Sequence, residues 1–334
     1  MDLLVLFLSF CGGILGAAIG GLASFILCGV AGLIGIALSS AGVQFDWLGI
    51  VSFGPVFGPH IAFAGGVGAA AFAKKIKVLE TGKDTVTALI SIKKISVLLV
   101  GGVFGAFGYV CAFVIGKILP GRIDGVALTV MISAIIAKLV FTGELFGKVG
   151  EEDKKLGGRF SPLAKSAWVD YMTTAAQKTI LAVAFGGLSA YITHLMLLNE
   201  QTAAAAVFFG FCISATSLIF LQFGTAVPVT HHITLCAAYG VVASGGNILW
   251  GIAAAIIAAF LGDFLARLFC CYGDVHIDPP AMSIAATSLI LLGILPNTGI
   301  FNLQPAIIVL PVIAIALVYS FLEYNWINKK SLQS

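Results

Sequence analysis

Histidines stand beside glycines and prolines at two places in very apolar parts of the chain. The first stretch reads FGPVFGPHI (53–61) and the second reads FGTAVPVTHHI (223–233). His60 and His232 take matching positions, and His231 adds a third ring. An imidazole can donate to an anion, carry a proton or ligate a metal, although a lone histidine more often serves packing. Because a metal needs three or more converging ligands, we assign no metal site.

The same stretches predict broken helices. Pro59 lacks an N–H and suits the first position of a helix. A helix over 59–73 is about 22 Å long, too short to cross a bilayer, so it would begin inside the membrane after an unwound segment at 54–58. Thr230 can cap a second helix that starts near His231. Two such helix starts, facing a common centre, suit an anion or a polar, electron-rich solute. The alternative is a pair of kinks whose histidines bond neighbouring carbonyl groups.

Two aspartates form a second paired feature. Asp124 lies in RID (122–124) and Asp278 in HIDPP (276–280). Asp278 before Pro279 and Pro280 is typical of a helix N-cap, and Asp124 before Gly125 can cap in the same way. A direct role with a solute or a cation is the alternative.

These considerations give a set of candidate site residues. We expect the substrate pathway to be lined by Gly54, Gly58, Pro59, His60, Gly224, Thr225, Pro228, Thr230, His231 and His232. We expect the paired helix starts to be organised by Asp124, Asp278, Pro279 and Pro280.

Three further charged residues lie within apolar stretches. Asp263 and Arg267 are four residues apart, so they share a helix face and are expected to pair. Lys138 lies well inside a predicted span. It could reach the membrane interface, pair with Asp263 or add positive charge to the pathway.

Composition places these residues in a membrane protein. Of 334 residues, 60% are hydrophobic and 10% charged, and the mean hydropathy is +1.08. Long uncharged stretches recur along the chain, as in a polytopic all-α membrane protein. The predicted spans are 3–25, 26–41, 48–73, 96–116, 124–146, 176–197, 202–222, 224–244, 246–269, 279–296 and 302–323.

The distribution of lysine and arginine predicts the orientation. Segments 74–94 and 148–178 carry six basic residues each, and Arg267, Lys329 and Lys330 bring the total to fifteen of eighteen. Placing these regions in the cytoplasm satisfies the positive-inside rule. We therefore expect an integral protein of the cell membrane with its N-terminus outside and its C-terminus in the cytoplasm.

Short matches recur in the same order in both halves. AIGGLASF (18–25) matches AFGGLSAY (184–191), the two histidine stretches match, and GRIDGVALTVMISA (121–134) matches VHIDPPAMSIAATS (275–288). An odd number of spans in each copy inverts the second, which indicates an inverted repeat with broken half-helices. The predicted organisation is a first membrane repeat (1–147), a basic cytoplasmic linker (148–175), a second repeat (176–296), and an extra C-terminal span and tail (297–334).

The second half resembles the HPP family of integral membrane proteins. The resemblance rests on QFGTAV (222–227), GGNILWGIAAAIIAAFLGD (245–263) and HIDPPAMSIAATSL (276–289). Pro279 and Pro280 match the family's prolines, whereas His276 stands two residues too early and the first half has Gly125 and Val126 in place of the prolines. Some members are linked to nitrite transport, so the resemblance implies an anion site.

The sequence therefore predicts a transporter or channel for a small solute, with an anion as the first choice. The alternatives are a proton- or metal-cation carrier that uses the histidines and aspartates, and a non-transporting membrane subunit. No nucleophile–base constellation or HExxH motif occurs, so we expect no enzyme and no cofactor. The expected partners are the lipid bilayer and a small solute or ion, with a homo-oligomer left open and no nucleic acid.

Overall fold

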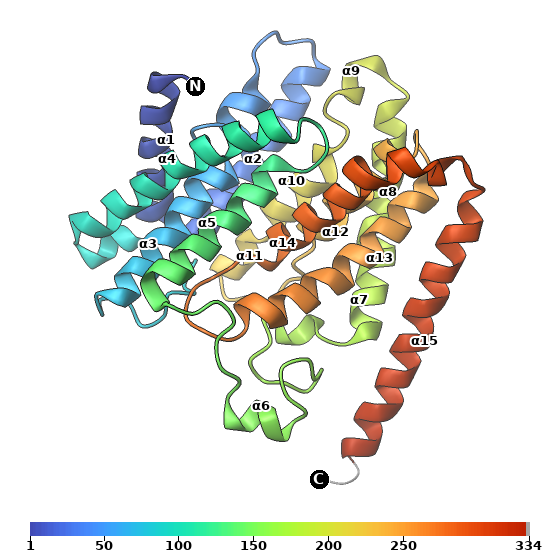
Figure 1. Ribbon diagram of the computed structural model, residues 1–334. Helices are drawn as coiled ribbons and strands as arrows, with labels where there is room; N and C mark the ends of the chain where they lie inside the picture. The colour runs from blue at the N-terminus through green and yellow to red at the C-terminus, as the bar shows by residue number, and fades with distance from the viewer. Residues whose placement is uncertain (332–334) are drawn as a thin grey trace.

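The computed structural model describes residues 1–331, and these residues form an all-α protein (Figure 1). In chain order, the α-helices are α1 (Leu3–Ile19), α2 (Gly21–Ser40), α3 (Ala64–Lys75), α4 (Ile95–Ile118), α5 (Gly125–Thr142), α6 (Glu151–Lys155), α7 (Ala175–Leu181), α8 (Gly187–Leu197), α9 (Glu200–Ala203), α10 (Phe208–Ser217), α11 (Ile219–Gln222), α12 (His231–Ala243), α13 (Ile248–Leu265), α14 (Pro279–Ser288) and α15 (Pro305–Ser331). Short π-helical or 3-10 segments join or flank them: η1 (Leu48–Ser52), η2 (Pro59–Phe63), η3 (Leu89–Ile92), η4 (Asp170–Met172), η5 (Ala182–Gly186), η6 (Ala266–Cys270), η7 (Leu289–Ile294), η8 (Leu295–Thr298) and η9 (Ile300–Asn302).

Seven helices in the described residues are long and apolar enough to cross a membrane. They are Gly21–Ser40, Ile95–Ile118, Gly125–Thr142, Ala175–Leu197, Ile248–Cys270, Pro279–Thr298 and Pro305–Lys330. Three shorter apolar helices, at Leu3–Ile19, Phe208–Gln222 and His231–Ala243, fall where the sequence predicts further spans. The remaining predicted span, 48–73, is interrupted. The chain is therefore an all-α protein with seven candidate membrane spans.

The first long apolar run forms two helices, as expected, but they divide earlier than predicted. The break falls at Gly20, whose φ of 97° is readily available only to glycine, rather than near residue 25. By contrast, Gly186 and Gly187, which match the Gly20 region in the sequence comparison, lie within the continuous helix Ala175–Leu197. The two matched stretches therefore occupy different places in their helices.

Small residues let the helices of the first half approach closely. A Cβ added at Gly13 on α1 would lie 2.9 Å from the Cα of Gly105 on α4 and would collide with the carbonyl oxygen of Gly101. Such small-residue contacts are a common means of packing helices in membranes.

The same helix pairs pack in both halves. α3 contacts α4 and α5 in the first half, and α12 contacts α13 and α14 in the second. Across the halves, α2 packs on α10 and α5 on α14. Both cross-half pairs are antiparallel: Gly29 lies against Thr216 while Gly32 lies against Cys212, and the N–H of Asp124, at the start of α5, donates to Ser288 at the end of α14.

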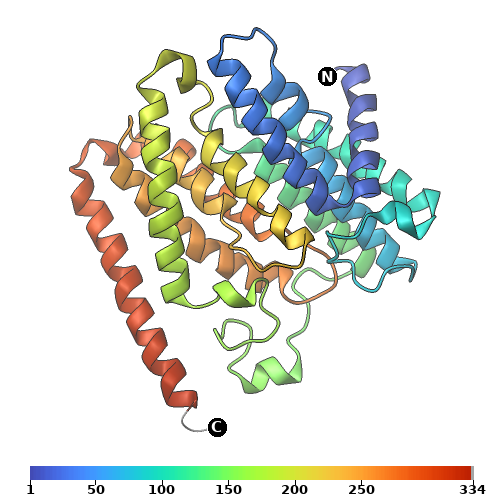
Figure 2. The same ribbon diagram turned by 180° about the vertical axis from the view of Figure 1, so that it is seen from behind.

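Helix α15 lies at one edge of the molecule, against α7 and α13 (Figures 1 and 2). In both views the N-terminus is at the top, and α15 descends to the bottom. The loop after α2 and helix α9 are at the top, and α6 lies at the bottom.

Candidate functional site

The first interrupted stretch contains the predicted helix start. Residues 53–58 are non-helical, and a helix then runs from Pro59 through η2 and α3 to Lys75, two residues beyond the predicted end. The Gly58 N–H donates to the Gly54 carbonyl at 2.9 Å. A Cβ added at Gly58 would lie 2.8 Å from the Phe53 carbonyl oxygen, so the tight path of the break requires a glycine here.

The second interrupted stretch covers residues 223–230, and α12 begins at His231, as predicted. The prediction that Thr230 caps this helix is wrong. Thr230 has φ −120° and ψ 0°, outside the extended conformation usual for an N-cap, and its hydroxyl donates to the Ser214 hydroxyl at 3.1 Å. Gly224 and Thr225 are exposed, so this stretch begins at the surface.

Two cavities meet beside these helix starts. The first has a volume of about 670 Å³ and the second about 520 Å³. Phe25, Phe63, His231 and Asp278 line both cavities. Phe25, Phe63 and His231 are each less than 10% exposed (8%, 6% and 5%), so the two spaces are separated by one layer of buried side chains.

The cavities extend from this layer toward opposite ends of the molecule. The first reaches the exposed Asp46 in the loop after α2 and the exposed Ala204 beside α9, at the top of Figure 1. The second reaches Thr85 and the linker residues 165 and 167–171, which follow α6 at the bottom. Together, they form an hourglass closed at its waist.

The first cavity is lined by equivalent residues of the two halves. Aligning His60 with His232, and Asp124 with Asp278, gives five pairs in which both members line this cavity. They are Pro59 with His231, Phe63 with Leu235, Asp124 with Asp278, Ala127 with Ala281, and Val130 with Ile284. Each half therefore contributes the first residue and the following turn of its half-helix, together with the cap and inner face of its fifth helix.

Of the candidate residues, Pro59, Asp124, His231 and Asp278 line the first cavity, and the structure brings them together there. The other candidates do not line either large cavity within the described residues: Gly54, Gly58, His60, Gly224, Thr225, Pro228, Thr230, His232, Pro279 and Pro280. His232 instead lines a small void of about 20 Å³ beside Lys178 and Asp263.

All three histidines of the interrupted stretches are buried. Within residues 1–331, the Nδ1 atoms of His60, His231 and His232 have no hydrogen-bond partner. A buried polar atom without a partner is uncommon in a native fold and indicates a site that a ligand or water completes. Only His231 combines this feature with a place in both large cavities.

Both aspartates cap their helices, as predicted. One oxygen of Asp124 accepts from the Ala127 N–H at 2.8 Å, and the other accepts from the Tyr239 hydroxyl at 2.7 Å. Asp278 accepts from the Ala281 N–H at 2.8 Å, and its other oxygen lies 3.2 Å from His276 Nε2. Each carboxylate therefore stabilises the start of its helix, and both residues also line the first cavity.

The aromatic wall of the first cavity was not predicted from the sequence. The rings of Phe25, Phe53, Phe63, Phe208 and Phe211 line it, and neighbouring rings lie 4.8–5.8 Å apart between centroids. Phe63 could have been found, because it lies four residues after Pro59 and so shares its helix face. The others come from separate helices, and no local pattern connects them.

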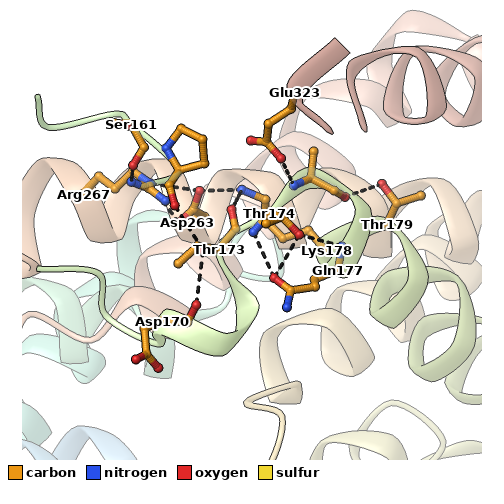
Figure 3. Close-up of polar contacts among 12 residues, drawn as sticks. Ser161, Asp170, Thr173, Thr174, Gln177, Lys178, Thr179, Asp263, Arg267 and Glu323 are labelled. Carbon is orange, nitrogen blue, oxygen red and sulfur yellow. Dashed lines mark hydrogen bonds and ion pairs between the residues drawn. The ribbon is translucent and has the colours of Figure 1, made fainter. Parts of the chain in front are cut away.

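A buried ionic cluster anchors the linker beside the second cavity. Figure 3 shows Asp263 between Lys178 and Arg267, at distances of 2.6 Å and 3.0 Å. Arg267 also donates to the Ser161 carbonyl, and Lys178 to the Thr173 carbonyl. The predicted Asp263–Arg267 pair is confirmed, and the cluster ties the middle of the linker at Ser161 and its end at Thr173 to α13 and η6.

Lys138 does not pair with Asp263. It is fully buried, and its ammonium donates to the carbonyls of Phe269 at 2.6 Å and Tyr272 at 2.9 Å. A cation at the carbonyl end of a helix is favoured by the backbone dipole, which explains the position.

Asp153 organises the linker itself. Desolvation raises the pKa of its carboxyl, but hydrogen bonds from Ser166, from the Lys165 N–H and from the Tyr272 hydroxyl outweigh this effect and leave the pKa below its usual value. Arg159 donates to the carbonyls of residues 146 and 147, after α5, and of residues 267 and 268 in η6. The floor of the second cavity is therefore an ordered segment.

The comparison with protein families agrees with the two-fold character of this site. The profile of a family of unknown function (DUF7973) matches residues 1–157 and, a second time, residues 150–310. The chain belongs to this family. Two matches of DUF7973 within one chain point to an internal duplication, as the sequence repeats do. No curated protein and no solved structure matches the chain.

Proposed function

We propose that the protein is a membrane transporter or channel that moves a small solute through the two cavities. The observation that carries this proposal is that cavities reaching opposite ends of the molecule share Phe25, Phe63, His231 and Asp278. A path across a membrane protein that is closed by one layer of side chains is the arrangement from which a solute pathway opens.

The proposal includes an inverted repeat of two five-span copies with an extra C-terminal span. The antiparallel packing of α2 on α10 and of α5 on α14 supports the inverted repeat, because the two helices of each pair occupy equivalent positions in the two copies. Two copies inserted with opposite orientations place equivalent helices antiparallel where they meet. The excess of lysine and arginine in the linker and in 74–94 then faces the cytoplasm.

The charge of the first cavity favours a cation over the anion that the sequence led us to expect. Asp46, Asp124 and Asp278 line it, Asp278 with His276 Nε2 at 3.2 Å, and no lysine or arginine of residues 1–331 lines it. Pro59, at the start of the first half-helix, has no N–H to offer an anion, and Asp124 and Asp278 already bind the N–H groups at the starts of α5 and α14. An anion is the second candidate, because the dipole end of α12 at His231 and the resemblance to the HPP family favour it.

Flux into liposomes tests the proposal, and the chain supplies a matched pair of variants. His60 and His231 are both buried and both have an unpartnered Nδ1, but only His231 lines the cavities. We expect purified protein to pass small solutes, His231→Ala to change the rate or the solute preference, and His60→Ala to leave both unchanged. Equal effects of the two variants, or no flux for any solute tested, would contradict the proposal; the latter would favour a non-transporting subunit.

A further inference from the structure

The first cavity has an unusual combination of large size, an aromatic wall and acidic groups. A volume of about 670 Å³ is in the range of sites for drug-sized molecules and far exceeds what a bare ion fills. Most of its lining is apolar, whereas hard metal cations require several converging oxygen ligands. Within the described residues, no group of three or more histidine, cysteine, aspartate or glutamate side chains could hold a metal.

The aromatic wall is continuous across the two halves. Phe25 and Phe211 are 5.6 Å apart between ring centroids, Phe53 and Phe208 are 4.8 Å apart, and Phe25 lies 4.8 Å from the His231 ring. Aromatic faces attract cations through their quadrupole and accept apolar groups by burial. The same wall can therefore bind a solute that carries both a cationic group and apolar groups.

The carboxylates lie on the same cavity as this wall. Asp124 and Asp278 come from the starts of antiparallel helices. One oxygen of Asp124 accepts from the Ala127 N–H and the other from the Tyr239 hydroxyl. An organic anion in this space would face both carboxylates, and a wholly apolar solute would leave the His231 Nδ1 without a partner.

We propose that the first cavity binds an organic ammonium ion: an amine carrying apolar groups, with its cationic centre in the space that Asp124 and Asp278 line and its apolar groups against the phenylalanine wall. This inference rests on the proposed function and names the substrate class of the same site. The His231 ring, at the waist, then bounds the end of the binding space nearest the second cavity.

Asparagine variants test the charge with little damage to the fold, because asparagine is as good a helix N-cap as aspartate. Asp124→Asn and Asp278→Asn remove the cavity charges. Asp2→Asn is the matched control, since Asp2 caps α1 through the Leu4 N–H at 2.8 Å, is exposed, and does not line either large cavity of the described chain. Size-exclusion profiles and helical content check that each variant is folded.

Calorimetric titration of the full chain in detergent would use benzyltrimethylammonium, with benzenesulfonate and benzyl alcohol as the anionic and neutral probes. We expect the ammonium probe to bind, the other two to bind at least about tenfold more weakly, each asparagine variant in the cavity to weaken ammonium binding by roughly tenfold, and Asp2→Asn to leave it unchanged. Phe211→Leu should also weaken it, by a few-fold.

Benzenesulfonate binding as tightly as the ammonium probe, or ammonium binding unaffected by both Asp124→Asn and Asp278→Asn, would overturn the inference. Binding and flux measured together also distinguish a failure of this binding site from a failure of the proposed transport function. Ammonium binding without flux of any solute supports this site and contradicts transport, whereas flux of other solutes without ammonium binding contradicts this site and leaves transport in place.

Discussion

The buried cluster of Asp263, Lys178 and Arg267 permits a quantitative prediction. The Lys178 and Arg267 side chains are 7% and 4% exposed, and Asp263 is the carboxylate that contacts both. Asp263→Asn keeps the shape of the side chain but leaves two adjacent buried cations without their counter-ion. Removing one partner of a buried ion pair costs about 3–5 kcal/mol, so we expect a loss of this size and a fall in melting temperature of roughly 5–15 °C.

A second substitution identifies the cause. Lys178→Met alone leaves the Asp263–Arg267 pair intact and should cost less, about 1–2 kcal/mol. Adding Lys178→Met to Asp263→Asn removes one stranded cation, so the double variant should be more stable than Asp263→Asn alone. Thermal unfolding in detergent measures all three, with the exposed Glu151→Gln as a control that should not shift. A loss below about 1 kcal/mol for Asp263→Asn, or strict additivity in the double variant, would show that the buried cations do not depend on Asp263.

Two further predictions concern the end of the molecule that carries the linker. Lys138→Met leaves the carbonyls of Phe269 and Tyr272 without their donor and should cost about 1–3 kcal/mol, whereas the exposed Lys117→Met should cost nothing measurable; equal melting temperatures would contradict this. The lowered pKa of Asp153 means that its stabilisation of the linker is present above pH 3.8 and is lost as the pH falls through the folded-state pKa. Hydrogen exchange in the linker should therefore show a transition below pH 3.8 and none between about pH 5 and 7, and Asp153→Asn should raise exchange at neutral pH; a transition near pH 6 would contradict the assignment.

Local chemistry predicted the helix starts well. A proline without an N–H, or an aspartate with a side-chain acceptor, determines its own position in a helix, and the structure begins helices at Pro59, after Asp124 and after Asp278. Thr230 was the exception, because Ser214 on another helix competes for its hydroxyl. Only the fold brings that competitor near.

The cavity was less predictable than the helices. In sequence, His60 and His232 are as good candidates as His231, but of the three only His231 lines the large cavities. His232 follows His231 in α12, and successive residues of a helix point in different directions. The phenylalanine wall combines residues as far apart as Phe25 and Phe211, whose meeting depends on the packing of α2 on α10. The sequence similarity of the halves predicts that equivalent residues meet, but not which ones.

Cysteine accessibility tests most directly whether the two cavities open to opposite sides. Ala204 lines the first cavity but not the second, and Ala167 lines the second cavity but not the first. In a background with the seven native cysteines replaced, Ala204→Cys and Ala167→Cys would be treated in oriented vesicles with a membrane-impermeant thiol reagent. We predict that each reacts from one side only and that the two sides are opposite. Reaction of both from the same side would contradict the account.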